Sequence, residues 1–284
     1  MVDFRNSDVE GPTSTTARGV WTTRPSTALP ASPPLTPVTN PAIAGGTTGA
    51  RNKRLATRIR RIGRVALIGG LVLASVFAVL IFAYRWIAPP TTTLMLAQRI
   101  MGTRIDRAWR PFEQISPHLA RAVVMSEDAG FCGHRGVDFA ELERVYERGL
   151  EGGSRGGGST IAMQVTKNLF LWPSKSYIRK AVEIPLTLVA DRWWGKRRML
   201  EIYLNIAEWG PGVFGAEAAA RTYFDKPASE LTEGEAALLA VALPNPIARN
   251  AADPTAQQRR MAGVVQARMR QGANNVRCLT RVRR

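Results

Sequence analysis

A run of 20 residues without a single charge, from Val65 to Tyr84, constrains this chain more than any other feature. An α-helix of about 20 residues crosses the roughly 30 Å of hydrocarbon in a lipid bilayer. The alternative is a buried helix of a soluble domain. Gly69 and Gly70 disfavour that alternative because glycine weakens a soluble helix but is common in membrane spans. The run therefore predicts one transmembrane helix over residues 65–84.

The flanks of this run predict its orientation. Seven Lys and Arg residues lie in the juxtamembrane segment 51–64, directly before the apolar run. Because basic residues next to a span stay on the cytoplasmic side, the N-terminus is expected in the cytoplasm and everything after Arg85 on the far side. Tyr84 and Trp86 lie where an interfacial aromatic belt is expected.

The first 50 residues are dominated by Thr, Pro, Ser, Gly and Ala and show no sustained apolar period. Such a composition buries too little apolar surface to fold, so residues 1–50 are predicted to be a disordered cytoplasmic tail. A cleaved secretory signal is excluded because the apolar segment begins too late in the chain. The remaining length of this 284-residue chain accommodates one ordinary folded domain.

The formal net charge of +17 is typical of a chain that binds nucleic acid or an anionic membrane surface. Residues 1–88 carry 11 basic and 3 acidic side chains, and residues 89–284 carry 28 and 19, so no single block holds the charge. The basic tail 256–284, with eight arginines, suits anionic lipid headgroups. A membrane-tethered nucleic-acid or scaffold protein is an alternative, and the expected topology counts against it.

Only two cysteines occur, Cys132 and Cys278. Their spacing is not that of a structural zinc site. In an extracytoplasmic domain a disulfide between them is chemically permitted, but two cysteines alone leave the pairing open.

After residue 88 the pattern predicts helices separated by loops, with few alternating apolar stretches, and residues 89–255 are expected to form the folded domain. Three helix starts are indicated by capping residues: Ser116 with Pro117, Ser159 ahead of a helix over 161–171, and Thr232 with Glu235 in capping-box spacing.

Two adjacent acids, Glu127 and Asp128, end a predicted helix just before a loop that contains His134. Negative charge at a helix C-terminus is unfavourable against the macrodipole, which suggests a purpose other than helix stability. The alternative is that Glu127 is a surface acid and His134 a residue that packs the loop.

A glycine-rich loop over 156–158 leads into a predicted helix. Glycines let the backbone approach a phosphate, and a helix N-terminus offers N–H groups to an anion. Thr160, Gln164 and Lys167 share one face of this helix. The pattern is not a P-loop, and the alternative is a linker before an ordinary amphipathic helix.

Three cations and an acid crowd the segment from Lys175 to Glu183. Arg179 and Glu183 are four residues apart, a spacing that by default gives a solvated ion pair on a helix. A cluster of cations also suits a pyrophosphate leaving group.

Taken in order, these segments resemble the peptidoglycan glycosyltransferase family, found as monofunctional enzymes and as a domain of bifunctional penicillin-binding proteins. The resemblance spans nearly the whole expected domain. Its five motifs stand here as Glu127-Asp-x-x-Phe-x-x-His-x-Gly136, Gly157-Gly-Ser-Thr-Ile-x-x-Gln164 with Lys167-Asn168, Arg179-Lys-x-x-Glu183, Lys196-x-x-Met-Leu-Glu-Ile-Tyr-Leu-Asn205, and Gly215-x-x-x-Ala-Ala-x-x-Tyr-Phe-x-Lys226.

The resemblance implies a mainly α-helical, lysozyme-like fold and the substrate lipid II, a disaccharide-pentapeptide on undecaprenyl pyrophosphate. With no transpeptidase segment before the chain ends at Arg284, the monofunctional form is expected. The enzyme would polymerise lipid II into glycan strands at the bacterial inner membrane, with an extracytoplasmic domain. A lysozyme-like enzyme that cleaves peptidoglycan is the alternative.

By the resemblance, Glu127 is the catalytic base and Glu183 a second essential acid. Glu183 would either orient the cations or bind a divalent ion such as Mg²⁺ or Mn²⁺; no cofactor is required by this interpretation. Partners implied are lipid II, the growing glycan chain, the membrane, and cell-wall synthesis or division proteins, but not nucleic acid. Expected substrate or pyrophosphate contacts are Ser159, Thr160, Gln164, Lys167, Asn168, Lys175, Arg179 and Lys180, and expected supporting residues are Asp128, Phe131, His134, Gly136 and Asn205.

Overall fold

A computed structural model describes residues 48–151, 157–174 and 176–280. The chain divides into two compact units, residues 1–59 and residues 60–284. Of the first unit the structure describes only residues 48–59, which begin a helix. The predicted disordered tail therefore lies outside the described residues, apart from its last three. The contacts reported below belong to the second unit.

The first helix, α1 (Thr48–Ala83), is longer than the predicted span because the basic segment before it is helical too. Among the described residues it is the one helix long and apolar enough to cross a membrane, over Leu55–Ala83. Its apolar side chains are largely exposed, Leu67 to 64% and Leu71 to 60%. Exposed apolar surface on this scale suits hydrocarbon better than water.

The C-terminal end of α1 is fastened to the rest of the second unit by side-chain donors on backbone carbonyls. The indole nitrogen of Trp194 donates to the carbonyl of Ile81 at 2.7 Å. Just after the helix, the guanidinium of Arg198 donates to the carbonyls of Tyr84 and Ile87 at 2.9 and 2.8 Å. These bonds satisfy carbonyls that a helix end leaves without partners.

The described part of residues 60–284 is mainly helical, which confirms the predicted fold class. The α-helices after α1 are α2 (Thr93–Ile100), α3 (Pro117–Glu127), α4 (Phe139–Leu150), α5 (Ile161–Phe170), α6 (Tyr177–Ile206), α7 (Ala216–Phe224), α8 (Glu233–Ala242), α9 (Ala256–Gln271) and α10 (Arg277–Thr280), with short 3₁₀ turns η1 (Phe112–Gln114), η2 (Ala228–Glu230) and η3 (Ala273–Val276).

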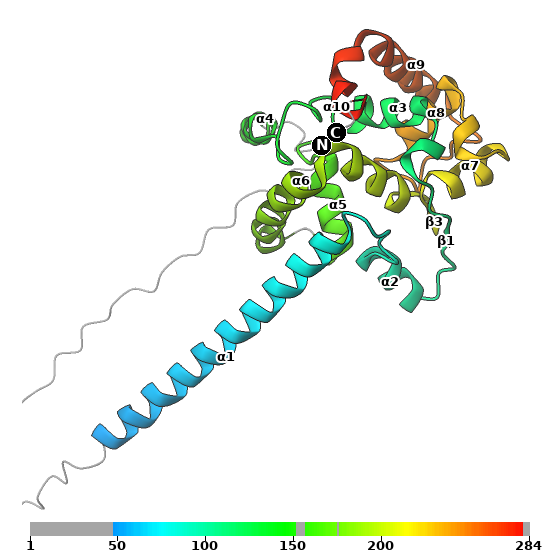
Figure 1. Cartoon of the computed structure of the whole chain (residues 1–284). Helices are drawn as coiled ribbons and strands as arrows, with labels where there is room; N and C mark the ends of the chain where they lie inside the picture. The colour runs from blue at the N-terminus through cyan, green and yellow to red at the C-terminus, as the bar shows by residue number, and fades with distance from the viewer. Residues whose placement is uncertain (1–47, 152–156, 175, 281–284) are drawn as a thin grey trace, which may run out of the picture. The chain divides into compact units, whose positions relative to one another are not determined.

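Two groups of helices build the core (Figure 1). Helix α5 packs along α6, and α3 packs against both α8 and α9. Residues from both groups join one hydrophobic cluster, in which Leu119, Ile161, Met199 and Leu239 are fully buried. Because α3 and α5 share this cluster, the end of α3 is held close to the face of α5.

Three short strands form a small sheet in the order β1-β3-β2. β1 (Asp106–Arg107) pairs in parallel with β3 (Val213–Phe214), and β2 (Glu208–Gly210) pairs antiparallel with β3. β2 follows directly after α6, so the sheet ties the end of α6 to the segment that comes before α3.

Helix α6 contains one residue with non-helical dihedral angles, Gly195, at φ +73° and ψ 169°. L-residues with a side chain rarely adopt this region, whereas glycine does so freely. The break divides α6 into a first part that starts at the cation cluster and a second part that ends in the core at Ile206.

The capping predictions can be compared with the observed helix starts. Ser116 caps α3 with Pro117 as its first residue, and Thr232 forms a capping box with Glu235 on α8, as predicted. The prediction of Ser159 as the cap of α5 is wrong by one residue. Thr160 is the cap, because its hydroxyl accepts from the backbone N–H of Met163 at 3.2 Å.

The region expected as a basic tail, residues 256–284, begins with a packed helix. Residues 256–271 form α9, which packs on α8 and α3 and buries Ala262, Val265 and Met269. Beyond it, Cys278 forms a disulfide with Cys132, with Cα atoms 5.6 Å apart. The pairing that the sequence leaves open is thus present, and it fastens the chain end to the loop after α3.

Candidate active site

Glu127 is the last residue of α3 and lies half-buried against α5. The amide nitrogen of Gln164, on α5, donates to Glu127 Oε2 at 3.0 Å. Burial raises the pKa of the Glu127 carboxyl, and the Gln164 bond opposes this rise. The charge of Asp128 adds to the rise. A carboxyl with a raised pKa is suited to accept a proton.

Asp128 resolves the electrostatic problem of two acids at one helix end, because its carboxylate turns away from α3. It accepts from the first backbone N–H of α5, at Ile161, at 3.0 Å, and contacts His134 Nε2 at 2.9 Å. The positive end of the α5 dipole therefore stabilises a charge that the end of α3 disfavours. The adjacent acids thus have different surroundings: Asp128 is buried in the fold, and Glu127 faces the site.

Gly136 closes the loop after α3 at a point where no side chain fits. Its φ is +85°, and a Cβ there would lie 2.9 Å from the Asp191 Cβ and 3.0 Å from the Thr187 carbonyl. The Thr160 hydroxyl donates to the Gly136 carbonyl at 2.5 Å. Thr160 therefore joins this loop to the start of α5, and it is buried as a structural residue.

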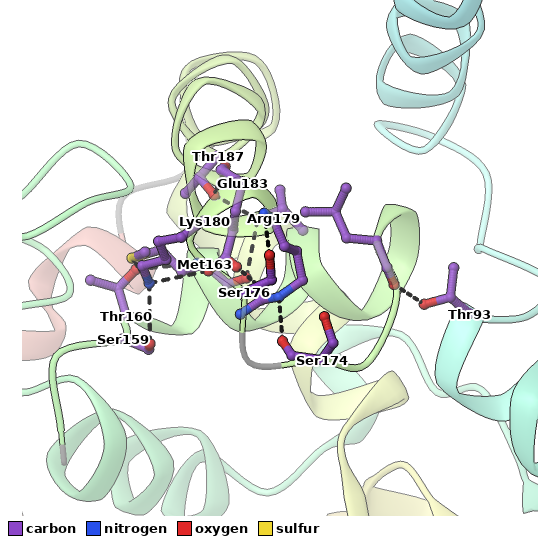
Figure 2. Close-up of polar contacts among 12 residues, drawn as sticks. Thr93, Ser159, Thr160, Met163, Ser174, Ser176, Arg179, Lys180, Glu183 and Thr187 are labelled. Carbon is purple, nitrogen blue, oxygen red and sulfur yellow. Dashed lines mark hydrogen bonds and ion pairs between the residues drawn. The ribbon is translucent and has the colours of Figure 1, made fainter. Parts of the chain in front are cut away.

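A cluster of charges lies at the start of α6 and is shown in Figure 2. Glu183 is 2% exposed and pairs with Arg179 and, at 3.4 Å, with Lys180. The Lys180 amine also reaches Ser159 Oγ at 3.4 Å, and Arg179 Nε donates to the Ser174 carbonyl at 2.7 Å. Each cation thus joins Glu183 to a second segment: Lys180 reaches Ser159, and Arg179 reaches Ser174.

Lys167, on α5, connects the two acids electrostatically. Burial lowers the pKa of its amine, and the charge of Glu183 opposes this. Arg179 lowers the pKa further, while Glu127 raises it. Lys167 therefore lies within electrostatic reach of both Glu127 and the cation cluster, on the same helix as Gln164.

A cavity of about 440 Å³ opens next to these cations. Lys167, Asn168 and Arg179 line it together with Thr93 and Leu94 of α2. The Thr93 hydroxyl contacts the carbonyls of Asn168 and Leu171 at 2.9 and 2.5 Å, which holds α2 against the end of α5. Helix α2, which forms this wall of the cavity, is the next helix after α1 in sequence.

Some of the predicted site residues make structural contacts instead of contacts with Glu127 or the cation cluster. Asn205 is buried and holds the backbone of Arg110, through bonds of 2.7 and 2.8 Å, rather than facing Glu127. Phe131 is fully buried, with the Lys196 amine 4.8 Å from its ring centroid. Lys175 lies outside the described residues.

Two residues near Glu127 were not among the expected site residues. The Tyr203 hydroxyl donates to Gln164 Oε1 at 3.1 Å, and Arg249 lies close enough to lower the pKa of Glu127. Tyr203 belongs to the fourth motif, but the resemblance assigned it no role. Arg249 follows the turn at Pro244, outside the five motifs.

The residues at Glu183 do not fit a divalent cation. Its two oxygens contact Arg179 and Lys180, and a donor set that is already paired with two positive charges repels a third. Across the described residues, no group of three or more His, Cys, Asp or Glu side chains is arranged to hold a metal ion.

A half-buried glutamate with a raised pKa, near a cation cluster and a cavity, is an arrangement typical of an enzyme active site. Residues 95–270 match the family model described as Transglycosylase, and the chain belongs to that family.

Similar proteins named biosynthetic peptidoglycan transglycosylase occur in several bacteria. The protein of Rhizobium johnstonii is 46% identical over 220 residues, which cover 78% of this chain and 90% of the relative. That of Agrobacterium fabrum is 50% identical over 190 residues, covering 67% and 84%. That of Rhizobium leguminosarum bv. trifolii is 47% identical over 223 residues, covering 78% and 95%.

Proposed function

We propose that this chain is a peptidoglycan glycosyltransferase that polymerises lipid II into linear glycan strands and releases undecaprenyl pyrophosphate. The observation that carries the proposal is that Lys167 lines one cavity with Arg179 and lies within electrostatic reach of both Glu127 and Lys180. Membership of the transglycosylase family and the names of its relatives support it.

In the proposed reaction a sugar hydroxyl of the acceptor attacks the anomeric carbon of the donor chain. Glu127 takes the hydroxyl proton as the new C–O bond forms, a role that ordinarily contributes about 10² to 10⁴ in rate. The bond from the anomeric carbon to the pyrophosphate oxygen breaks, and its electron pair leaves with the pyrophosphate. Attack opposite the leaving group inverts the anomeric configuration.

The cations have the complementary role of stabilising the pyrophosphate as its charge develops. Lys167 and Arg179 line the cavity, and Lys180 extends the positive surface toward Ser159. Groups fixed before the reaction stabilise developing charge more effectively than groups that must reorganise. Glu183 supplies this fixation, because its buried carboxylate pairs with both Arg179 and Lys180.

We place the catalytic domain on the extracytoplasmic side of the bacterial inner membrane, with the N-terminus in the cytoplasm and α1 as the span. The basic residues at the start of α1 support this orientation. The disulfide between Cys132 and Cys278 supports it independently, because disulfides persist in oxidising compartments and are rare in the cytosol. A membrane anchor also keeps the enzyme beside a substrate whose lipid remains in the bilayer.

The test is incubation of the purified full-length chain with lipid II, followed by gel separation of the products. Longer glycan strands and free undecaprenyl pyrophosphate are the expected result, with or without added Mg²⁺ or Mn²⁺. Finished peptidoglycan is the matched second substrate. Soluble fragments from it, with no polymer from lipid II, would contradict the proposal and favour a lysozyme-like hydrolase.

A further inference from the structure

Three side chains from three different helices form a continuous chain of hydrogen bonds that ends on the proposed base. The Tyr203 hydroxyl of α6 bonds Gln164 Oε1 at 3.1 Å, and Gln164 Nε2 of α5 bonds Glu127 Oε2 at 3.0 Å. Tyr203 is 2% exposed. We propose that Tyr203 is a positioning residue for the reaction: its hydroxyl fixes the Gln164 amide so that the amide nitrogen donates to the Glu127 carboxylate.

The chemistry of the groups determines this arrangement. A carboxylate only accepts hydrogen bonds, and an amide has one donor end and one acceptor end. When Glu127 is ionised, Gln164 must turn its nitrogen toward Glu127 and its oxygen toward α6. Tyr203 meets that oxygen with an O–H donor and also polarises the amide, which strengthens the bond at the other end.

The Tyr203 hydroxyl has no other evident task in the fold. A buried hydroxyl without a partner costs free energy, so a core position that needs only volume is filled more favourably by phenylalanine. Within the described part of the chain, Gln164 is the group to which this hydroxyl is bonded. Burial, followed by the charges of Glu127 and Asp128, raises the pKa of the phenol well above its ordinary value, which keeps it a donor.

Loss of the hydroxyl changes which form of Glu127 the surroundings favour. In a Tyr203→Phe chain, the buried Gln164 oxygen has lost its donor, and the amide gains by rotating that oxygen toward the carboxyl. That orientation suits a protonated Glu127, which donates, and disfavours the ionised form. The proton affinity of the base therefore rises when the hydroxyl is removed.

Other charges face Glu127 and set the background for this effect. Asp128 raises the pKa of Glu127, while Lys167 of α5 and Arg249 after α8 lower it. None of these groups changes when Tyr203 becomes phenylalanine. A shift in the pH profile then reports the hydrogen-bond chain itself.

The test rests on the proposed function and compares pH profiles of lipid II polymerisation by full-length variants. For Tyr203→Phe we expect the acidic limb of kcat to move upward by roughly 0.5 to 1 pH unit, with little change at high pH or in KM. Tyr223→Phe is the matched control, because its hydroxyl also makes one 3.1 Å bond, to the Trp209 carbonyl away from Glu127. Its profile should overlay that of the wild-type chain.

A double substitution separates the effect of the hydrogen-bond chain on the pH profile from the effect of core packing. In a Gln164→Leu background the chain of hydrogen bonds to Glu127 is already broken. Adding Tyr203→Phe should then shift the acidic limb of the kcat profile no further. If the Tyr203→Phe profile overlays the wild type while its thermal stability falls as in Tyr223→Phe, the hydroxyl is merely structural and the inference is overturned. A wild-type chain that fails to polymerise lipid II contradicts the proposed function instead.

A second measurement decides the matter if Tyr203→Phe polymerises too weakly for a profile. As pH rises, the difference in thermal stability between a chain with Glu127 and its Glu127→Gln variant grows and then becomes constant, and the pH at which it becomes constant follows the pKa of Glu127 in the folded chain. Comparison of Tyr203→Phe with Tyr203→Phe/Glu127→Gln should place that pH higher than the same comparison in the wild-type background. An unchanged pH would overturn the inference.

Discussion

Replacing both Cys132 and Cys278 by serine removes the covalent link between the loop after α3 and the C-terminal end of the domain. The two residues are 146 apart in sequence, so the link closes a long loop in the unfolded chain. Chain-entropy reasoning gives about 5 kcal/mol of stabilisation for a loop of that length at 25 °C, and measured disulfides typically give about 2 to 4 kcal/mol.

The expected effect is a lower melting temperature. For a domain of this size each kcal/mol corresponds to about 2 to 4 °C, so the double serine variant should melt about 4 to 16 °C below the wild type. Part of the attachment survives, because Val276 and Leu279 remain buried and Arg197 donates to the Leu279 carbonyl at 3.2 Å. The domain should therefore still fold.

Thermal unfolding of the detergent-solubilised protein, followed by tryptophan fluorescence, measures this difference. The wild-type chain in a strong reductant is the matched control and should melt close to the double variant, which should not respond to the reductant. Thiol titration of the unfolded, unreduced wild type should find no free cysteine. A melting temperature of the double variant within about 1 °C of the oxidised wild type would refute the loop-closure reasoning.

Four further predictions concern the site and its support. Glu183→Gln should lower polymerisation by about 100-fold or more, because the cations lose the buried charge that fixes them. Gly136→Ala should lower the free energy of unfolding by about 2 kcal/mol or more, because its Cβ meets Asp191; Gly157→Ala, also at positive φ but in open space, is the milder control. Polymerisation should fall as pH drops through the raised pKa of Glu127, at a pH above that of an ordinary glutamate. A raised carboxyl pKa contributes stability that is lost as pH rises through it, so Glu127→Gln should melt higher than the wild type at pH 8 and lose this advantage in acid.

The three substitutions each have a result that would contradict the prediction. A mild effect of Glu183→Gln would reduce Glu183 to a salt-bridge partner. Equal unfolding free energies for Gly136→Ala and Gly157→Ala would mean that crowding at Gly136 is relieved by movement. A Glu127→Gln chain that melts below the wild type at pH 8 would mean that the carboxylate is better solvated than its burial indicates.

Local rules predicted the parts of the fold that depend on neighbours in sequence. The uncharged run gave α1, and the capping patterns gave the starts of α3 and α8. At α5 the pattern was wrong by one residue, since Ser159 and Thr160 are equally good caps in sequence. Only the tertiary contact of Thr160 with the Gly136 carbonyl distinguishes them.

Long-range packing explains what the sequence did not reveal. The arginine-rich region after residue 255 was expected as a basic tail suited to anionic lipid headgroups, and within it the apolar residues of α9 are buried on the face that packs against α8. In the site, sequence grouped Gln164 with the phosphate-binding residues because of helical spacing. The structure directs its amide to Glu127, a contact between α5 and α3 that no spacing rule contains. Its proposed contact with pyrophosphate stays a prediction.

The central claim is that Glu127 acts as the base in glycan polymerisation, and Glu127→Gln tests it most directly because glutamine keeps the shape but cannot accept the proton. The measurement is the rate of polymer formation from purified lipid II, together with the affinity of each chain for lipid II. We expect the rate to fall by about 10² to 10⁴ while the affinity changes little. A near-normal yield of glycan polymer from Glu127→Gln would contradict the assignment.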